Sequence, residues 1–130
     1  MFIRLENVYY SYFQHTPFEV QALKNVTLTI DRGESVGIIG RTGCGKSTLI
    51  QHFNALLFPT QGFVMIDGDK IQKKGSQLRG IRKKIGLVFQ YPEHQIFEET
   101  VFDEVAFGPR NNGVGGEELE ETVKWALESV

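Results

Sequence analysis

Two segments near the N-terminus alternate apolar residues with other residues, which is the period-2 pattern of half-buried strands. The first alternation slips near Asn7, whereas the second is regular. We expect two antiparallel strands, separated by a loop at residues 15–19 that contains Pro17. The alternating residues are Ile3, Leu5, Val8, Tyr10 and Tyr12 in the first segment and Val26, Leu28 and Ile30 in the second.

Two short apolar runs predict strands of another kind, buried on both faces as in a parallel sheet. They are residues 35–40 (SVGIIG) and 85–89 (IGLVF). Between them, residues 63–67 predict a further strand, closed by an Asp-Gly turn. We therefore expect an α/β core with an antiparallel β region attached to it.

Apolar residues spaced three and four apart predict two helices. The first begins near Lys46 and ends before Pro59, because proline cannot continue a helix. The second spans residues 117–130. The apolar positions are Leu49, Ile50, Phe53, Leu56 and Leu57 in the first helix and Leu119, Val123, Ala126, Leu127 and Val130 in the second.

The composition is that of a folded domain, with 41% hydrophobic residues, 23% charged residues and a formal net charge of −2. Positive charge is concentrated in residues 70–84, which hold half of the 14 Lys and Arg residues and no acid. We interpret this block as a solvated connector that leads into the 85–89 strand. A nucleic-acid patch is the alternative, but the block has no aromatic residue to stack on a base.

The strongest chemical signal is GRTGCGKST at residues 40–48, which fits the phosphate-loop pattern G-x-x-x-x-G-K-[ST]. A predicted buried strand precedes it and a predicted helix follows it. Glycines let backbone N–H groups approach a phosphate closely, and the helix N-terminus adds the positive end of its dipole. We expect a phosphate site formed by Gly40, Arg41, Thr42, Gly43, Cys44, Gly45, Lys46, Ser47 and Thr48.

Three side chains of this loop have expected roles. Lys46 reaches the β- and γ-phosphates of a nucleotide, the Ser47 hydroxyl ligates Mg²⁺, and Thr48 is placed for a further phosphate contact. Cys44, the single cysteine, has two interpretations: a reactive thiol near a helix N-terminus, or a small residue that the loop tolerates. We favour the second, because nothing nearby suggests a redox partner.

Two other segments narrow the class of phosphate-loop protein: LENVYYSYF…ALKNVTLTIDRGESVGIIG before the loop, and IGLVFQYPEHQIFEETVFDEVAFGP at residues 85–109. Together with the loop, they closely resemble the ATP-binding subunits of ABC transporters. The later segment resembles the A components of energy-coupling-factor importers, the cobalt and vitamin uptake group, with their run Q-x-P-E-x-Q-x-F-x-x-T-V. The matching residues are Gln90, Pro92, Glu93, Gln95, Phe97, Thr100 and Val101.

This resemblance implies a P-loop fold of the ABC type, with a mostly parallel core sheet and an antiparallel β subdomain. It divides the chain into an antiparallel β region (1–35), the P-loop strand, helix and following strand (36–69), a basic connector with the Gln90 strand (70–90), and the start of a helical subdomain (91–130). It implies ATP and Mg²⁺ as cofactors.

The resemblance also assigns two residues outside the loop. Tyr12 matches the aromatic residue that stacks on adenine, with Tyr10 or Phe13 as the alternatives. Gln90 matches the glutamine that approaches Mg²⁺ and the attacking water. A neutral amide suits that role, because its carbonyl can orient water.

Features that the family uses for hydrolysis are missing: an apolar strand that ends in Asp-Glu, an L-S-G-G-Q motif and a later histidine. We reject Asp103 and Glu104 as the catalytic pair and assign no catalytic residue. His15, His52 and His94 are interpreted as lone surface histidines. We expect a truncated N-terminal piece of a longer ATPase, which alone hydrolyses little or no ATP.

For the full-length protein, the resemblance implies ATP-powered uptake of a metal ion or vitamin, as a peripheral subunit on the cytoplasmic face of the cell membrane. A second A component, like or unlike, is one implied partner. A transmembrane coupling subunit is the other, and it would contact residues 92–109, from Pro92 to Pro109, where apolar anchors lie among acids. The same aromatic residues could instead pack on this chain's own core.

Three other functions compete with this one. The first is a non-hydrolysing nucleotide-binding or regulatory module. The second is a nucleic-acid-associated ABC protein that uses Lys70 to Lys84, although we expect no nucleic-acid partner. A small-molecule kinase is a distant third, since neither an acceptor site nor a lid can be identified.

Overall fold

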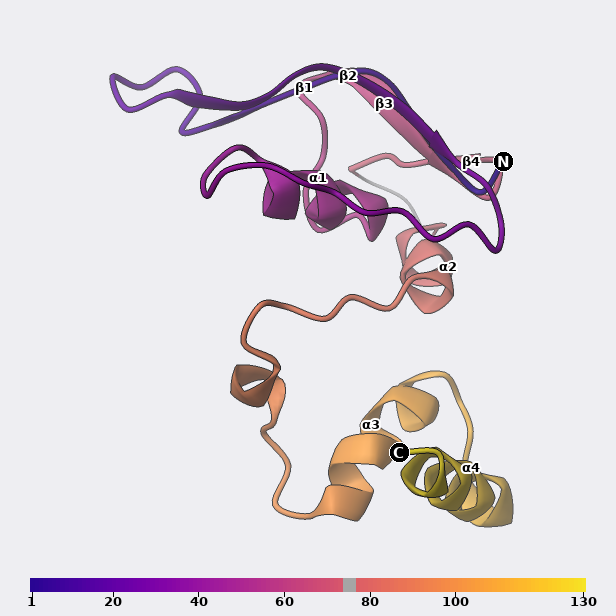
Figure 1. Cartoon of the computed structure of the whole chain (residues 1–130). Coiled ribbons are helices and arrows are strands. Elements are labelled where there is room, and N and C mark those ends of the chain that lie inside the picture. Colours follow the sequence, from indigo (N-terminus) through magenta and orange to yellow (C-terminus); the bar gives the residue numbers. More distant parts are fainter. Residues whose placement is uncertain (74–76) are drawn as a thin grey trace. The chain divides into compact units, whose positions relative to one another are not determined.

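A four-stranded sheet in the order β2-β1-β3-β4 forms the largest part of the structure, and each of these pairs is antiparallel (Figure 1). The structure is a computed structural model and describes residues 1–73 and 77–130. The sheet belongs to the first of two units, Met1–Leu87, and the second unit is Val88–Val130. The strands are β1 (Ile3–Tyr12), β2 (Val20–Ile30), β3 (Gln61–Ile66) and β4 (Asp69–Lys70).

A bulge in β1 explains why the sequence alternation slips. Leu5 pairs with Leu28 and Val8 with Val26, so β1 carries one extra residue between these two pairs. Asn7 takes the positive φ of +47° that the bulge requires. Because of the extra residue, Leu5 and Val8 both face the core and are fully buried, although three positions separate them. The predicted slip and the predicted antiparallel pairing are confirmed.

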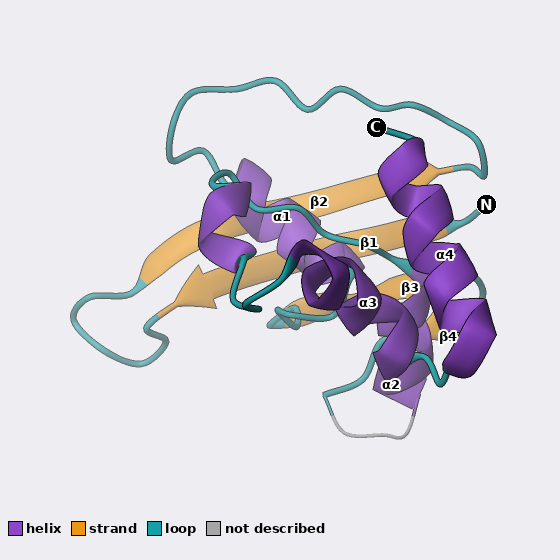
Figure 2. Cartoon of the chain, turned by 90° about the horizontal axis from the view of Figure 1, so that it is seen from below, coloured by secondary structure: helices purple, strands orange, loops and turns teal. Residues whose placement is uncertain are grey.

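Two helices of the first unit pack on the sheet and close its core. Helix α1 (Lys46–Phe53) lies across one face of the sheet (Figure 2), and helix α2 spans Gln77–Lys84. Phe53 and Ile81 bring these helices into the same cluster as the strands. Burying a side chain of this size contributes about 1.5–3 kcal/mol. The buried strand residues of the cluster are Ile3, Leu5, Val8, Leu23, Val64 and Ile66.

Helix α1 is shorter than its apolar spacing predicts. It ends at Phe53, and Ala55 has a left-handed φ of +57° that the helix cannot accommodate. The Arg82 guanidinium donates a hydrogen bond of 3.1 Å to the Ala55 carbonyl. The turn that follows α1 is therefore held by α2, a long-range contact that helical periodicity does not reveal.

The two predicted parallel strands do not form. Residues 35–40 and 85–89 are irregular, and apolar side chains on them are exposed, with Ile39 at 97% and Val88 at 77%. A strand is defined by hydrogen bonds to its neighbours, and neither segment pairs with a strand among the described residues. The apolar character of the runs was identified correctly, but the described part of the chain has no partner strand that covers them.

The basic block differs from the predicted connector, because residues 77–84 of it form helix α2. Ile81 is buried and Leu78 packs against the same core, so apolar residues three apart anchor the helix. Residues 74–76 of the block lie outside the described residues. Arg82 and Lys84 bind carbonyl and carboxylate groups of this chain, which opposes a nucleic-acid role for the block.

The predicted Asp-Gly turn is confirmed between β3 and β4. Asp67 and Gly68 have φ values of +50° and +84°, as in a two-residue hairpin turn of the I′ type. The Asp67 carboxylate pairs with Lys84 at 2.8 Å and with Arg32 at 2.6 Å. Hydrogen bonds from Lys84 and Arg32 hold the pKa of Asp67 below its ordinary value. The turn thereby ties β3 to the end of α2.

The second unit consists of a short 3₁₀ helix, η1 (Pro92–Gln95), and the helices α3 (Val101–Asn111) and α4 (Gly116–Glu128). The Thr100 hydroxyl caps α3 by accepting a hydrogen bond of 3.1 Å from the Asp103 N–H. Ala106, Leu119 and Val123 form the buried core of this unit. Helix α4 confirms the predicted amphipathic helix. Within the described ranges, every helix is too short or too polar to span a bilayer.

A substitution at Gly62 tests how closely the backbones of β1 and β3 approach each other. The φ of Gly62 is +79°, and a Cβ there would lie 2.2 Å from the carbonyl oxygen of Asn7. We expect Gly62→Ala to lower the free energy of unfolding by about 3 kcal/mol or more, because backbone strain and a backbone clash add together. Urea unfolding followed by circular dichroism measures this loss.

Gly68→Ala is the matched control. Gly68 has a φ of +84° but open space around the Cβ position, so only the backbone strain of about 1–2 kcal/mol applies. Equal losses for the two variants would contradict the close approach at Gly62.

Candidate functional site

The phosphate loop, residues 40–48, turns tightly before it enters α1. The Cys44 N–H donates to the Arg41 carbonyl at 3.3 Å, and Gly43 and Gly45 have φ values of +80° and +96°. A Cβ at Gly45 would lie 2.5 Å from the carbonyl oxygen of Ala22 in β2. Glycine is therefore required at position 45 by both the backbone conformation and the close approach of the sheet.

Helix α1 begins directly after this glycine. The Leu49 N–H donates to the Gly45 carbonyl at 2.8 Å, which is the first helical hydrogen bond. The N–H groups of the first turn, which come before Leu49, have no hydrogen-bond partner within the helix. Together with the helix dipole, these N–H groups favour an anion at the mouth of the loop.

The Lys46 ammonium is held inside the loop. It donates to the carbonyl oxygens of Gly40 and Arg41, each at 2.8 Å, and lies 3.8 Å from the Cys44 sulfur. These bonds bring a full positive charge next to the first turn of α1. Carbonyl oxygens are weaker partners for ammonium than phosphate oxygens, so an anionic ligand can compete for the same proton donors.

A cavity of about 270 Å³ lies beside the loop. It is formed where the end of β1 and the start of β2 meet the first turn of α1. Six residues of the predicted site line it: Tyr12, Gly43, Gly45, Lys46, Ser47 and Thr48. Three further lining residues were not predicted: Val20, Gln21 and Ala22. The strand register places them at the cavity, because Tyr12 pairs with Val20. Predicting this register from the sequence requires knowing where β2 begins.

Of the three aromatic candidates on β1 and the residue after it, Tyr12 alone lines the cavity. Its hydroxyl lies 3.0 Å from the Thr48 hydroxyl, at the start of α1. Tyr10 points into the unit instead and packs at right angles against Tyr12 and His52, with ring centroids 4.9 and 5.0 Å away. Burial and the neighbouring Tyr12 raise the pKa of Tyr10. Phe13 is 69% exposed.

His52 is not the surface histidine that the sequence suggested. It is fully buried on α1, and its Nδ1 lies 2.7 Å from the Thr48 carbonyl oxygen. A carbonyl only accepts, so Nδ1 carries the hydrogen. Nε2 is buried and has no hydrogen-bond partner among the described residues. Burial lowers the pKa of His52, partly offset by the bond to Thr48.

The remaining predicted residues do not line this cavity. Arg41, Thr42 and Cys44 are exposed on the loop, and Gly40 contributes its carbonyl to Lys46. Gln90 belongs to the second unit, Val88–Val130, and is exposed in a bend after residues 85–89. Its contribution to a nucleotide site therefore stays a prediction.

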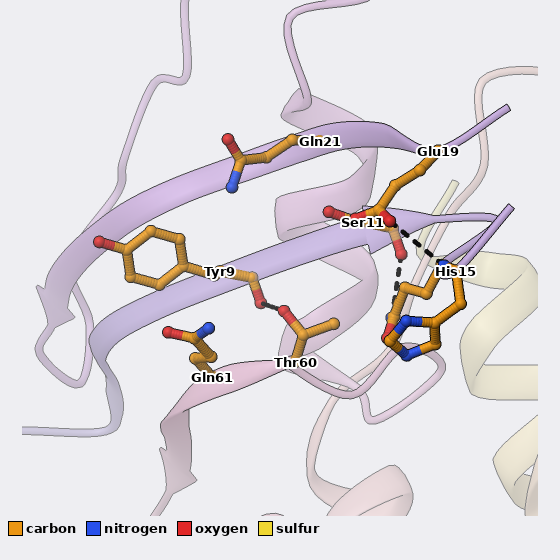
Figure 3. A pocket seen from close by; sticks show the side chains of 8 residues that line it. Tyr9, Ser11, His15, Glu19, Gln21, Thr60 and Gln61 are labelled. Carbon is orange, nitrogen blue, oxygen red and sulfur yellow. Dashed lines mark hydrogen bonds between the residues drawn. The ribbon is translucent and has the colours of Figure 1, made fainter. Parts of the chain in front are cut away.

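A second cavity, of about 380 Å³, differs in chemistry (Figure 3). Its lining residues are mostly polar and hydrogen-bond to one another. The Glu19 carboxylate accepts from the His15 N–H at 3.2 Å, and the Thr60 hydroxyl donates to the Tyr9 carbonyl at 2.9 Å. A carboxylate at the rim disfavours a polyphosphate. The cavity beside Lys46, although smaller, is the candidate site for an anion.

Comparison with known proteins identifies relatives over nearly the whole chain. The family model described as ABC transporter matches residues 23–130. The energy-coupling factor transporter ATP-binding protein EcfA2 of Clostridium acetobutylicum is 54% identical over 128 residues, which are 98% of this chain and 45% of that protein. The chain spans slightly less than half the length of the curated relatives that it matches.

Two solved structures share the fold with a TM-score of 0.82. One is cbiO1 of Clostridium perfringens, described as part of the ABC transporter complex cbiONQ, which is 35% identical and matches 98% of this chain and 49% of its own. The other is a dimeric ATP-binding cassette bound to ADP and Pi, 36% identical, matching 97% of this chain and 54% of its own. These matches confirm the predicted ABC-type α/β fold and the resemblance to A components.

The buried imidazole predicts a pH dependence of stability. The unfolded chain takes up a proton on His52 near the ordinary pKa of 6.5, whereas the folded chain does so only at lower pH. The free energy of unfolding should therefore be highest above pH 6.5 and fall as the pH drops below it. Urea unfolding at a series of pH values measures this. His52→Phe removes this titration, so a variant curve parallel to that of the wild type would contradict it.

Cys44 gives a second test of the loop. Its thiol is exposed, and a Cβ built on Gly40 would lie 2.6 Å from its sulfur. We expect alkylation of Cys44 to block nucleotide binding sterically, because the added group fills the turn beside Lys46. Calorimetric titration before and after complete alkylation measures it, with the Cys44→Ser variant treated with the same reagent as the control. Equal affinities for nucleotide before and after alkylation would contradict this expectation.

Proposed function

Because the chain belongs to the ABC transporter family, we propose that the cavity beside the phosphate loop binds ATP. The observation that supports this most is the convergence of three groups on one cavity. The Lys46 ammonium and the first turn of α1 suit a polyphosphate, and the Tyr12 ring suits a base.

Each loop residue has a part in this proposal. Lys46 exchanges its carbonyl partners for the β- and γ-phosphates, and the Thr48 hydroxyl adds a contact to the phosphates. Gly40, Arg41, Thr42, Gly43 and Gly45 present backbone N–H groups, and the Cys44 N–H joins them by exchanging the Arg41 carbonyl for phosphate. Tyr12 stacks on adenine, which is worth about 1–3 kcal/mol at other base-binding sites.

Mg²⁺ fits the donor chemistry of this site. Ser47 places an exposed hydroxyl on the first turn of α1, at the cavity. The described residues contain no cluster of three His, Cys, Asp or Glu side chains that could hold a metal ion without the nucleotide. Mg²⁺ often binds one protein oxygen together with phosphate oxygens and water. We propose Ser47 as its ligand in the first unit, whereas the role of Gln90 stays the prediction drawn from the family resemblance. When bound, Mg²⁺ neutralises charge on the transferring phosphoryl group.

For the whole protein, we propose the role that its relatives' names describe: the ATP-binding component of an energy-coupling factor transporter. ATP would be bound between two such components, and its hydrolysis would power uptake of a metal ion or vitamin. A dimeric cassette among the solved neighbours supports the pairing. The protein would lie at the cytoplasmic face of the membrane as a peripheral subunit.

The contact with a membrane subunit is proposed for residues 92–109. Phe97, Phe102 and Phe107 are exposed there at 62%, 39% and 44%. Ala106, in contrast, is buried in the core of the second unit, so this unit uses part of the segment for its own packing. Acidic residues flank these aromatic residues along the sequence: Glu93, Glu98, Glu99, Asp103 and Glu104. An apolar surface with an acidic rim suits a basic helix from a partner.

Replacing the loop lysine tests the proposal. We expect Lys46→Ala to weaken ATP binding by about 10- to 100-fold, because a charge-assisted hydrogen bond to phosphate contributes about 1.5–3 kcal/mol. Lys24→Ala, which removes an exposed lysine of β2, should leave the affinity unchanged. Isothermal titration calorimetry with ATP and Mg²⁺ measures both.

The 130-residue chain alone should bind ATP weakly and hydrolyse little or none, since the Asp-Glu strand end and the L-S-G-G-Q motif are not in its sequence. Phosphate release is the measurement, with Lys46→Ala as the control for contaminating ATPases. Sustained turnover that disappears in Lys46→Ala would overturn this expectation.

A further inference from the structure

We propose that His52 and Tyr10 are positioning residues for the base-binding side of the cavity, holding Tyr12 against α1. This inference rests on the proposed binding of ATP, and it assigns a role to two side chains that line neither the cavity nor the phosphate loop. The observation behind it is a closed circuit of contacts between two residues of β1 and two residues of α1.

The circuit has four contacts. The Tyr12 hydroxyl meets the Thr48 hydroxyl at 3.0 Å, and the Thr48 carbonyl accepts the Nδ1 hydrogen of His52 at 2.7 Å. The His52 ring packs at 82° to the Tyr10 ring, and the Tyr10 ring packs at 86° to the Tyr12 ring. Both ring pairs have the T-shaped geometry that aromatic groups favour. Each member of the circuit is thereby held by two others.

Thr48 is the point at which the circuit reaches the cavity. Thr48 is 7% exposed, and its two oxygens serve different partners, the hydroxyl binding Tyr12 and the carbonyl binding His52. A change at His52 acts first on Thr48, through the hydrogen bond to the Thr48 carbonyl. Tyr12 would shift with it, through the hydroxyl pair.

The expected benefit is preorganisation. A tyrosine ring that is free to rotate must be ordered when a base binds, and ordering one side chain costs about three- to tenfold in affinity. Because of the circuit, the Tyr12 ring is already ordered in the folded protein before the nucleotide binds. The Lys46 and loop N–H contacts to the phosphates do not involve the Tyr12 ring, so the gain should fall mainly on the base.

The chemistry of His52 suggests which substitutions are informative. Nε2 has no partner among the described residues, so phenylalanine would lose the Nδ1 bond but keep a ring against Tyr10. Asparagine would keep a donor near the Nδ1 position but lose the ring. Tyr10→Leu breaks the circuit from the strand side. Gln51→Ala, next to His52 on α1 and outside the circuit, is the control.

The test compares binding of ATP with binding of inorganic tripolyphosphate, which has the phosphates but no base, by calorimetry with Mg²⁺. We expect Tyr10→Leu and His52→Phe to weaken ATP three- to tenfold and to change tripolyphosphate less than twofold. His52→Asn should fall between them and the wild type, and Gln51→Ala should match the wild type. Circular dichroism establishes that each variant is folded.

Three outcomes would overturn the inference. Unchanged ATP affinity in Tyr10→Leu and His52→Phe would show that the circuit does not position Tyr12. Equal loss of ATP and tripolyphosphate, or failure of all three circuit variants to fold, would show that these residues only support the fold. Absence of ATP binding in the wild-type protein is a different result, because it would refute the proposed function itself.

Discussion

The close approach of Gly45 to the Ala22 carbonyl is the constraint on which the candidate site depends. It brings the backbone of the phosphate loop against β2, where a Cβ would lie 2.5 Å from the oxygen. The start of α1 is thereby brought to the ends of β1 and β2, and the cavity forms between them. The bulge at Asn7 acts on the same sheet, since it brings Leu5 and Val8 to the core face. Local backbone geometry, more than any single side-chain contact, produces the site.

The hydrogen bonds that Lys46 makes in the free protein limit the binding energy that a phosphate can gain from this side chain. Lys46 already makes two hydrogen bonds of 2.8 Å to carbonyl oxygens, so a phosphate gains only the difference between the old and new partners. The helix N-terminus differs, because its first N–H groups have no helical partners to give up. We therefore expect the backbone to supply a large share of the attraction and the lysine to add charge and placement.

How far the sequence predicted this structure depended on the range of the interactions involved. The Asn7 slip, the Asp67-Gly68 turn and the α1 start could be predicted because residues a few positions apart encode them. Failures occurred where distant residues decide. Residues 35–40 are apolar but have no strand partner within residues 1–73 and 77–130, and the α1 end depends on Arg82. In the site, the loop was found by its motif, whereas buried His52 and the start of β2 required the tertiary structure.

The distribution of aromatic residues gives the molecule two separate optical reporters. The one tryptophan, Trp125, is 70% exposed on α4 in the second unit. Three of the four tyrosines lie on β1 in the first unit, and one of them lines the cavity. Indole emission thus registers events on the helical unit, such as a partner covering α4, whereas most of the phenol groups report on the first unit. One sample can follow both without an added dye.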